Sequence, residues 1–103
     1  MSRIEKLLEY IREQGKDSFL QHALALEYIK IGNDEEARKL FTEILEREPG
    51  YVGSYYHLGK LLERANEFEE AMTIYRKGME ESQKANDMHS KMELQGALED
   101  IEE

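Results

Sequence analysis

The chain has 103 residues, of which 36% are charged, and a formal net charge of −9. This length suits one compact domain with a modest core and is too short for two ordinary domains. The acidic balance argues against nucleic acid or anionic lipid as the main partner, because both reward clustered Lys and Arg. Cysteine is absent, which excludes a disulfide framework, a thiolate metal site and a cysteine nucleophile.

The apolar residues at the start of the chain are interrupted by charges. From Met1 to Lys6 there is no continuous hydrophobic stretch of the kind that a signal peptide needs. No later apolar run reaches the length that spans a bilayer. We therefore expect a cytoplasmic protein without a membrane partner.

Two helices are predicted before residue 32. The first begins at a capping box, Ser2 followed three residues later by Glu5, and ends at Gly15. The second, capped by Asp17 or Ser18, carries two neighbouring apolar stripes and should make contacts on two sides. One stripe consists of Leu20, Leu24, Tyr28 and Ile31, and the other of Phe19, His22, Leu26 and Ile29.

Four more helices follow, each introduced by a turn signal. Asn33 with Glu36 starts the third, which ends at Pro49-Gly50, and the fourth runs from about Val52 to Ala65. The last two predicted caps are the pair Asn66 and Glu69, which opens the fifth helix, and Asn86-Asp87, which opens the sixth. Acidic residues fill most gaps in the sixth helix, and its polar face suits the end of a helical array.

The central helices repeat with a period of 34 residues. A period in this range marks stacked units that are each too small to bury their apolar face alone. Small residues at Ala25 and Gly59 should face Ala37 and Ala71, because paired helices approach closely only where side chains are small. The recurring residues are Leu24, Ala25, Tyr28, Ala37, Phe41 and Ile44 in one copy, and Leu58, Gly59, Leu62, Ala71, Tyr75 and Gly78 in the other.

These residues resemble the tetratricopeptide repeat, whose signature is an aromatic residue, Leu-Gly, an aromatic, Ala, an aromatic, a small residue and Pro. The departures are Gln21 for the first aromatic, Ile44 for a small residue, Leu62 for the second aromatic and Gln83 for Pro. Because position 83 holds Gln instead of the signature Pro, the fifth helix should continue further than the third. The matches are Leu24, Ala25, Tyr28, Ala37, Phe41 and Pro49 in one copy, and Tyr55, Leu58, Gly59, Ala71, Tyr75 and Gly78 in the other.

The resemblance implies an all-α fold, a right-handed α-solenoid of antiparallel helix hairpins with about six helices. It also implies a single domain over residues 1–103. Its expected parts are an N-terminal helix (1–16), a first repeat (17–50), a second repeat (51–84) and a C-terminal capping helix (85–103).

Proteins similar to this one bind extended or helical peptides in a concave groove lined by the first helix of each pair. The resemblance therefore implies a module for protein–protein interaction, such as a scaffold or an adaptor. Lys30 and Arg64 stand one repeat apart, and Lys60 lies one turn before Arg64, so a locally basic groove should attract an acidic peptide or a C-terminal carboxylate. The expected groove residues are Phe19, His22, Leu26, Ile29, Lys30, Tyr56, Lys60, Glu63 and Arg64.

Two alternatives stay open. The groove cations can be solvated residues that balance Glu27, Glu63 and Glu67, because exposed ion pairs are common and weak. The protein can also be a self-associating scaffold or an assembly adaptor without a peptide groove, and exposure of apolar residues on the sixth helix would favour such a homo-oligomer.

Some family members hold a terminal carboxylate with a Lys and Asn clamp, but Leu26 stands where that clamp places Asn.

No residue set points to catalysis. The histidines His22, His57 and His89 have neither an HExxH spacing nor a paired spacing on one helical face. Acidic runs sit at helix starts, where carboxylates favour the positive end of the helix dipole. Without a Gly-rich phosphate loop or a nucleophile beside a base, we expect no enzyme, no catalytic or metal site and no cofactor.

Overall fold

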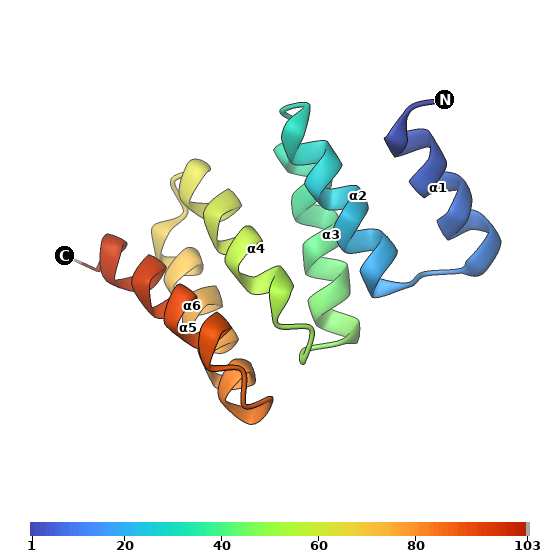
Figure 1. Ribbon diagram of the computed structural model, residues 1–103. Helices are drawn as coiled ribbons and strands as arrows, with labels where there is room; N and C mark the ends of the chain where they lie inside the picture. The colour runs from blue at the N-terminus through green and yellow to red at the C-terminus, as the bar shows by residue number, and fades with distance from the viewer. Residues whose placement is uncertain (103) are drawn as a thin grey trace. The chain divides into compact units, whose positions relative to one another are not determined.

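The computed structural model describes residues 1–102, and this part of the chain folds into six α-helices without a strand (Figure 1). The predicted all-α class and helix number are confirmed. None of these helices combines the length and apolar character needed to cross a bilayer. The helices are α1 Arg3–Gln14, α2 Ser18–Lys30, α3 Asp34–Arg47, α4 Gly53–Arg64, α5 Phe68–Lys84 and α6 Met88–Ile101.

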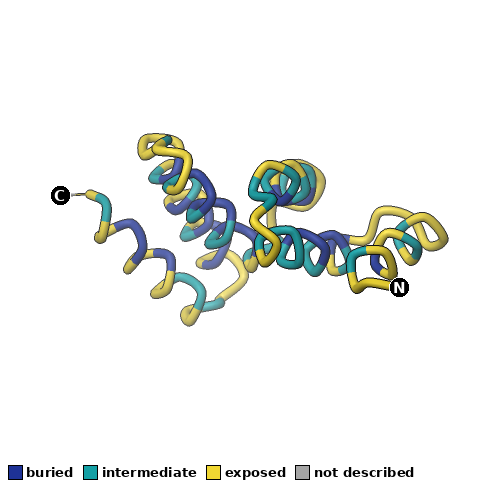
Figure 2. Tube along the Cα trace, turned by 90° about the horizontal axis from the view of Figure 1, so that it is seen from above, coloured by how far each residue is buried: buried dark blue, intermediate teal, exposed yellow. Residues whose placement is uncertain are grey.

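The helices form two compact units, Met1–Glu48 and Pro49–Glu103. In the first unit, α2 packs against both α1 and α3. In the second unit, α5 packs against α4 and α6, and α6 also touches α4. Figure 2 shows buried stretches alternating with exposed ones along the helices, as amphipathic helices require. The single domain over 1–103 stays a prediction.

Side chains cap most of the helices where the sequence predicts. Ser2 and Glu5 form the reciprocal capping box of α1, and α1 ends at Gly15 with a φ of 87°. Asp17 caps α2, and Asn33 and Asp87 cap α3 and α6. Each cap supplies an acceptor to a backbone N–H that has no partner within its helix. The N–H groups bound by the last three caps are those of Leu20, Glu36 and Ser90, at 3.0, 3.2 and 3.0 Å.

The predicted cap pair Asn66 and Glu69 is wrong. Asn66 adopts a left-handed conformation with φ 62°, and Glu67 precedes α5 without a side-chain cap hydrogen bond. The Asn66 N–H instead donates to the Glu63 carbonyl at 2.9 Å, which closes the end of α4. Asn tolerates a positive φ better than most residues, so it serves as readily after a helix as before one. Asn86 repeats the pattern after α5, with φ 57°.

The expectation that the fifth helix continues further than the third is confirmed by α5. It has 17 residues against 14 in α3, and so continues beyond the point where α3 stops. Pro follows α3 at position 49, whereas the repeat-equivalent residue of the second copy is Gln83, which lies inside α5. A residue with a free backbone N–H can extend a helix where Pro cannot.

The core of the first unit is built by α2 and α3. Ala25, Ala37, Phe41 and Ile44 are fully buried, and Leu7 of α1 is also buried. The two alanines occupy the positions at which the sequence predicts small residues. Burial of each large side chain contributes roughly 1.5–3 kcal/mol of transfer free energy, so packing dominates this unit.

Gln21 replaces the first signature aromatic without leaving a buried polar group unsatisfied. Its side chain is 2% exposed and accepts a hydrogen bond from Arg47 at 2.5 Å while donating to Glu43 at 3.3 Å. Arg47 also donates to the Ser18 hydroxyl, which in turn donates to Glu48, both at 2.8 Å. Buried polar groups are tolerated when they are hydrogen-bonded, so this network takes the place of an aromatic contact.

Two glycines allow close packing in the second unit. A β-carbon on Gly59 of α4 would overlap the ring of Tyr75, which is fully buried on α5. A β-carbon on Gly78 of α5 would lie 2.7 Å from Cβ of Tyr55 and 2.9 Å from Cδ1 of Leu94. The position of Gly78 therefore fixes the packing of α5 against both α4 and α6.

Replacement of Gly78 tests this packing. We expect Gly78→Ala to lower the free energy of unfolding by about 1–3 kcal/mol, because the added methyl group must displace Tyr55 or Leu94. Gly96 is the matched control, since it also lies within a helix and a β-carbon there meets no atom within 4 Å. Gly96→Ala should stabilise the protein by about 0.5–1 kcal/mol. Urea denaturation measures both, and equal effects would contradict the packing role of Gly78.

Candidate functional site

The expected groove residues of the first unit share one side of α2. Phe19, His22, Leu26, Ile29 and Lys30 follow one another at spacings of three, four, three and one residues, which places them on one helical face. We call these five residues the α2 face. Phe19 is 71% exposed and Lys30 is exposed, whereas the other three are half-buried. This side of α2 therefore combines apolar groups with a cation.

His22 connects the α2 face to the core. Its ring meets the ring of the buried Phe41 edge to face, with centroids 5.4 Å apart. Such aromatic pairs favour a fixed mutual orientation. This contact gives His22 a packing role.

Lys30 is paired within the first unit. Its Nζ lies 3.0 Å from Oε2 of Glu27, and Nε of Arg3 on α1 lies 3.2 Å from the same oxygen. The hydrogen bond from Lys30, supported by the charges of Lys30 and Arg3, lowers the pKa of the Glu27 carboxyl group against the opposing effect of desolvation. Glu27 is thus the shared acceptor of two cations from different helices.

The expected groove residues of the second unit share one side of α4. We call Tyr56, Lys60, Glu63 and Arg64 the α4 face; their spacings of four, three and one residues place them together. Nζ of Lys60 lies 5.5 Å from the centroid of the Tyr56 ring and 3.5 Å from Oε2 of Glu63. Arg64 is exposed at the end of α4. On the α4 face, Lys60 thus lies near both an aromatic ring and a carboxylate, and a second cation stands at the end of the helix.

Glu63 is also tied to the core of the second unit. The hydroxyl of Tyr75 on α5 donates a hydrogen bond to Oε2 of Glu63, the same oxygen that faces Lys60. Burial, followed by this hydrogen bond to a carboxylate, raises the pKa of the Tyr75 hydroxyl. Tyr75 therefore stays protonated at neutral pH and remains a hydrogen-bond donor.

The structure brings the predicted residues together within each helix face and pairs Lys30 and Lys60 with carboxylates. The pairs Lys30–Glu27 and Lys60–Glu63 agree with the balancing role that was left open from the sequence. Because the two faces belong to different compact units, the groove that would join them stays a prediction.

Two contributors were missed by the sequence reasoning. From the sequence, Tyr75 was identified only as a signature residue of the repeat. A buried tyrosine hydroxyl usually needs a hydrogen-bond partner, and that need was the available signal. Arg3 gave no such signal, because its contact with Glu27 depends on how α1 lies against α2. Both residues bind carboxylates on α2 or α4 from a neighbouring helix of the same unit.

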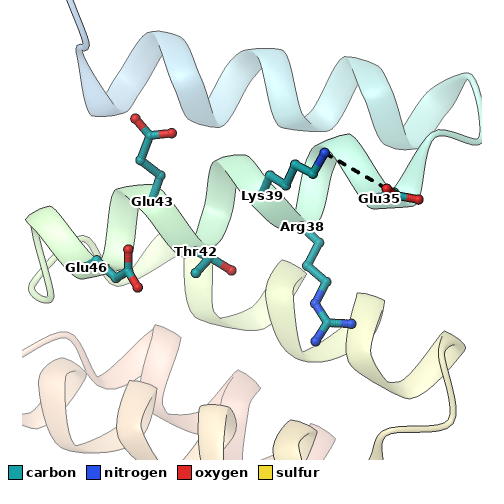
Figure 3. A pocket seen from close by; sticks show the side chains of 6 residues that line it. All are labelled: Glu35, Arg38, Lys39, Thr42, Glu43 and Glu46. Atoms are coloured by element: carbon teal, nitrogen blue, oxygen red, sulfur yellow. Dashed lines mark ion pairs between the residues drawn. The ribbon is translucent and has the colours of Figure 1, made fainter.

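A surface hollow in the first unit contains no residue of the α2 face. It has a volume of about 570 Å³, and all the residues that line it belong to α3. In Figure 3, Glu43 points toward α2, Arg38 points to the opposite side, and the dashed line joins Lys39 to Glu35 at 4.0 Å. The residues that line the hollow are Glu35, Arg38, Lys39, Thr42, Glu43 and Glu46.

Among residues 1–102, His, Asp and Glu side chains form no group of three that could hold a metal ion.

The tetratricopeptide repeat family matches residues 28–94, which is more than half of the chain. The chain belongs to the tetratricopeptide repeat family. A tetratricopeptide repeat domain protein from Salinibacter ruber has a similar crystal structure, with a TM-score of 0.80 and 40% sequence identity. The alignment covers 84% of this chain and 100% of that one. The all-α, solenoid-type repeat fold implied by the sequence is thus confirmed.

A protein from Bordetella parapertussis shares the fold at lower sequence identity. Its solution structure aligns with a TM-score of 0.82 and 21% identity, over 96% of this chain and 86% of that one. No curated protein matches the chain significantly. Tetratricopeptide repeat domains generally mediate protein–protein interactions, so the broad class of function follows from the family.

His57 links the α4 face to α6 in the second unit. Its ring lies edge to face with that of Tyr56, at a centroid distance of 5.7 Å. Burial lowers the pKa of the His57 imidazole below its usual 6.5, and the nearby charge of Glu93 on α6 partly opposes this shift. The neutral imidazole is therefore the form that the folded chain prefers.

The lowered pKa of His57 predicts a dependence of stability on pH. As the pH falls below 6.5, the unfolded chain takes up the proton before the folded chain does, so the free energy of unfolding should fall until the lowered pKa is passed. His57→Gln should remove this decline, whereas the control His89→Gln should keep it. Urea denaturation between pH 7.5 and the onset of carboxylate titration, at about pH 5, measures the effect. An unchanged slope in His57→Gln would contradict it.

Proposed function

We propose that the chain binds a peptide segment of a protein partner through the α2 face and the α4 face, and that this segment carries acidic side chains or a free C-terminal carboxylate. The observation that carries the proposal is the contact of Lys60 with the Tyr56 ring, with the exposed Arg64 one turn further along α4. Membership of an interaction family supports the broad function, and the chemistry of this face supports the class of partner.

The two faces offer complementary modes of contact. Lys60 and Arg64 can donate charge-assisted hydrogen bonds to carboxylates, and the Tyr56 ring can cover apolar atoms of the peptide. On the α2 face, the exposed Phe19 ring supplies an apolar contact and Lys30 a further cation. Since these charges stand on a chain of net charge −9, they can select an acidic segment locally even though the whole protein repels it.

The proposal requires neither catalysis nor a cofactor. Recognition by side chains on a preformed helical surface accounts for the residues on both faces, and no step of bond making is invoked. The cytoplasmic location expected from the sequence stays a prediction, as do the assignments against nucleic acid and membrane partners and the more specific roles of scaffold and adaptor.

One observation favours self-association as a second candidate. Met88 and Met92 of α6 are 50% and 68% exposed, whereas Leu98 of the same helix is buried. Methionine side chains are flexible and adapt to apolar partners, so the two residues suit an interface. Sedimentation at increasing protein concentration tests this candidate. A dimer that is lost in the Met88→Gln/Met92→Gln variant would support it, and a monomer at all concentrations would contradict it.

Charge reversal tests the peptide-binding proposal. The probe is a fluorescently labelled ten-residue peptide of alternating Glu and Leu with a free C-terminal carboxylate, titrated at low salt because exposed charges are screened at high salt. Lys60→Glu/Arg64→Glu should weaken binding about tenfold or more, since two attractive contacts become repulsive. Fluorescence anisotropy gives the Kd.

The matched control is Arg12→Glu/Lys39→Glu, which makes the same change in net charge on α1 and α3. Its Kd should stay close to that of the wild-type protein. Equal weakening in both variants would show a general charge effect and contradict a role for the α4 face.

A further inference from the structure

In each unit, the lysine proposed to bind the partner already holds a carboxylate of its own helix. Lys30 lies 3.0 Å from Glu27, and Lys60 lies 3.5 Å from Glu63. The glutamate side chains are only 16% and 19% exposed, whereas the lysine side chains are 70% and 33% exposed. The carboxylate of each pair is thus the more buried member, and the ammonium group is the more accessible one.

A second donor anchors each of these carboxylates. Arg3 of α1 holds Oε2 of Glu27 at 3.2 Å, and the buried Tyr75 hydroxyl of α5 holds Oε2 of Glu63. Either carboxylate can therefore keep its place when the lysine turns to a partner. Lysine has a flexible four-carbon stem, so it can make this exchange without movement of the helix.

The two arrangements do not arise from the sequence repeat itself. Glu27 precedes Lys30 by three residues, whereas Glu63 follows Lys60 by three. The second donors also differ in chemistry, a guanidinium group in the first unit and a phenol in the second. The same local outcome, an anchored carboxylate facing an exposed lysine, is thus reached by different residues in the two units.

We infer that Glu27 and Glu63 act as internal competitors, which occupy the lysine ammonium groups that an acidic partner needs and so set the specificity of the two faces. This inference rests on the proposed function. A partner carboxylate that binds Lys60 exchanges one ion pair for another and gains little from that pair alone. Net binding then depends on additional contacts, such as those to Tyr56 and Arg64. Isolated acids are disfavoured, and a segment that combines acidic with apolar groups is selected.

Removal of the charge of Glu63 tests the inference in the second unit. Glu63→Gln keeps an oxygen that can accept from the Tyr75 hydroxyl and abolishes the attraction to Lys60. The Glu-Leu peptide with a free C-terminal carboxylate should bind this variant about two- to fivefold more tightly than it binds the wild-type protein. Glu69→Gln is the matched control, since it changes the net charge equally at an exposed position of α5, and it should bind as the wild-type protein does.

Lys60→Met separates failure of the inference from failure of the proposed function. Weaker binding in Lys60→Met together with equal affinity in Glu63→Gln and Glu69→Gln would overturn the internal competitor and leave the peptide-binding face intact. Equal affinity of Lys60→Met/Glu63→Gln and Glu63→Gln, in which no carboxylate at position 63 occupies Lys60, would overturn both, as would no binding by the wild-type protein. Tighter binding in Glu63→Gln alone, lost again in Lys60→Met/Glu63→Gln, would support both.

Discussion

The close approach of the Tyr75 ring to the α-carbon of Gly59 is the constraint on which the second unit depends. With no side chain on Gly59, the ring fits between α4 and α5 and is fully buried. The same ring carries the hydroxyl group that holds Glu63, and Glu63 in turn faces Lys60. One tyrosine therefore both closes the hairpin and fixes the position of a charge on the α4 face. A shift of the ring would alter the packing of the hairpin and the position of Glu63 together.

The first unit reaches a related result with other residues. Phe41 stands one repeat before Tyr75 and lacks its hydroxyl group, and Ala25 stands where the second unit has Gly59. The carboxylate beside Lys30 is instead held by Arg3, from a helix outside the hairpin. Both faces thus present a lysine against an anchored carboxylate, and the proposed acidic partner would bind such faces by exchange of ion-pair partners rather than by filling an unoccupied cationic site. On that proposal, weak, selective binding of a segment with mixed acidic and apolar groups follows from this arrangement.

What the sequence predicted correctly is mostly local or periodic. The caps at Ser2, Asp17 and Asn33 depend on residues within one turn, and the fold class depends on a repeat that packing must respect. The prediction that Asn66 caps α5 failed because a short amide side chain suits both the start of a helix and a left-handed residue after a helix. The local sequence does not distinguish these two positions. The lysine–glutamate pairs follow from a spacing of three residues, but their second donors, Arg3 and Tyr75, come from other helices and depend on tertiary packing. The polar network around Gln21 could not be predicted from the sequence for the same reason, since it joins α2 to the end of α3.

A double-mutant cycle on Gly59 and Tyr75 tests the central claim most directly. The unfolding free energies of the wild-type protein, Gly59→Ala, Tyr75→Leu and the double variant are measured by urea denaturation under one set of conditions. If the ring occupies the space that a methyl group on Gly59 would need, the smaller leucine relieves the overlap, and Gly59→Ala costs at least about 1 kcal/mol less in the Tyr75→Leu background. Additive costs would mean that the two residues do not share that space and would contradict the account.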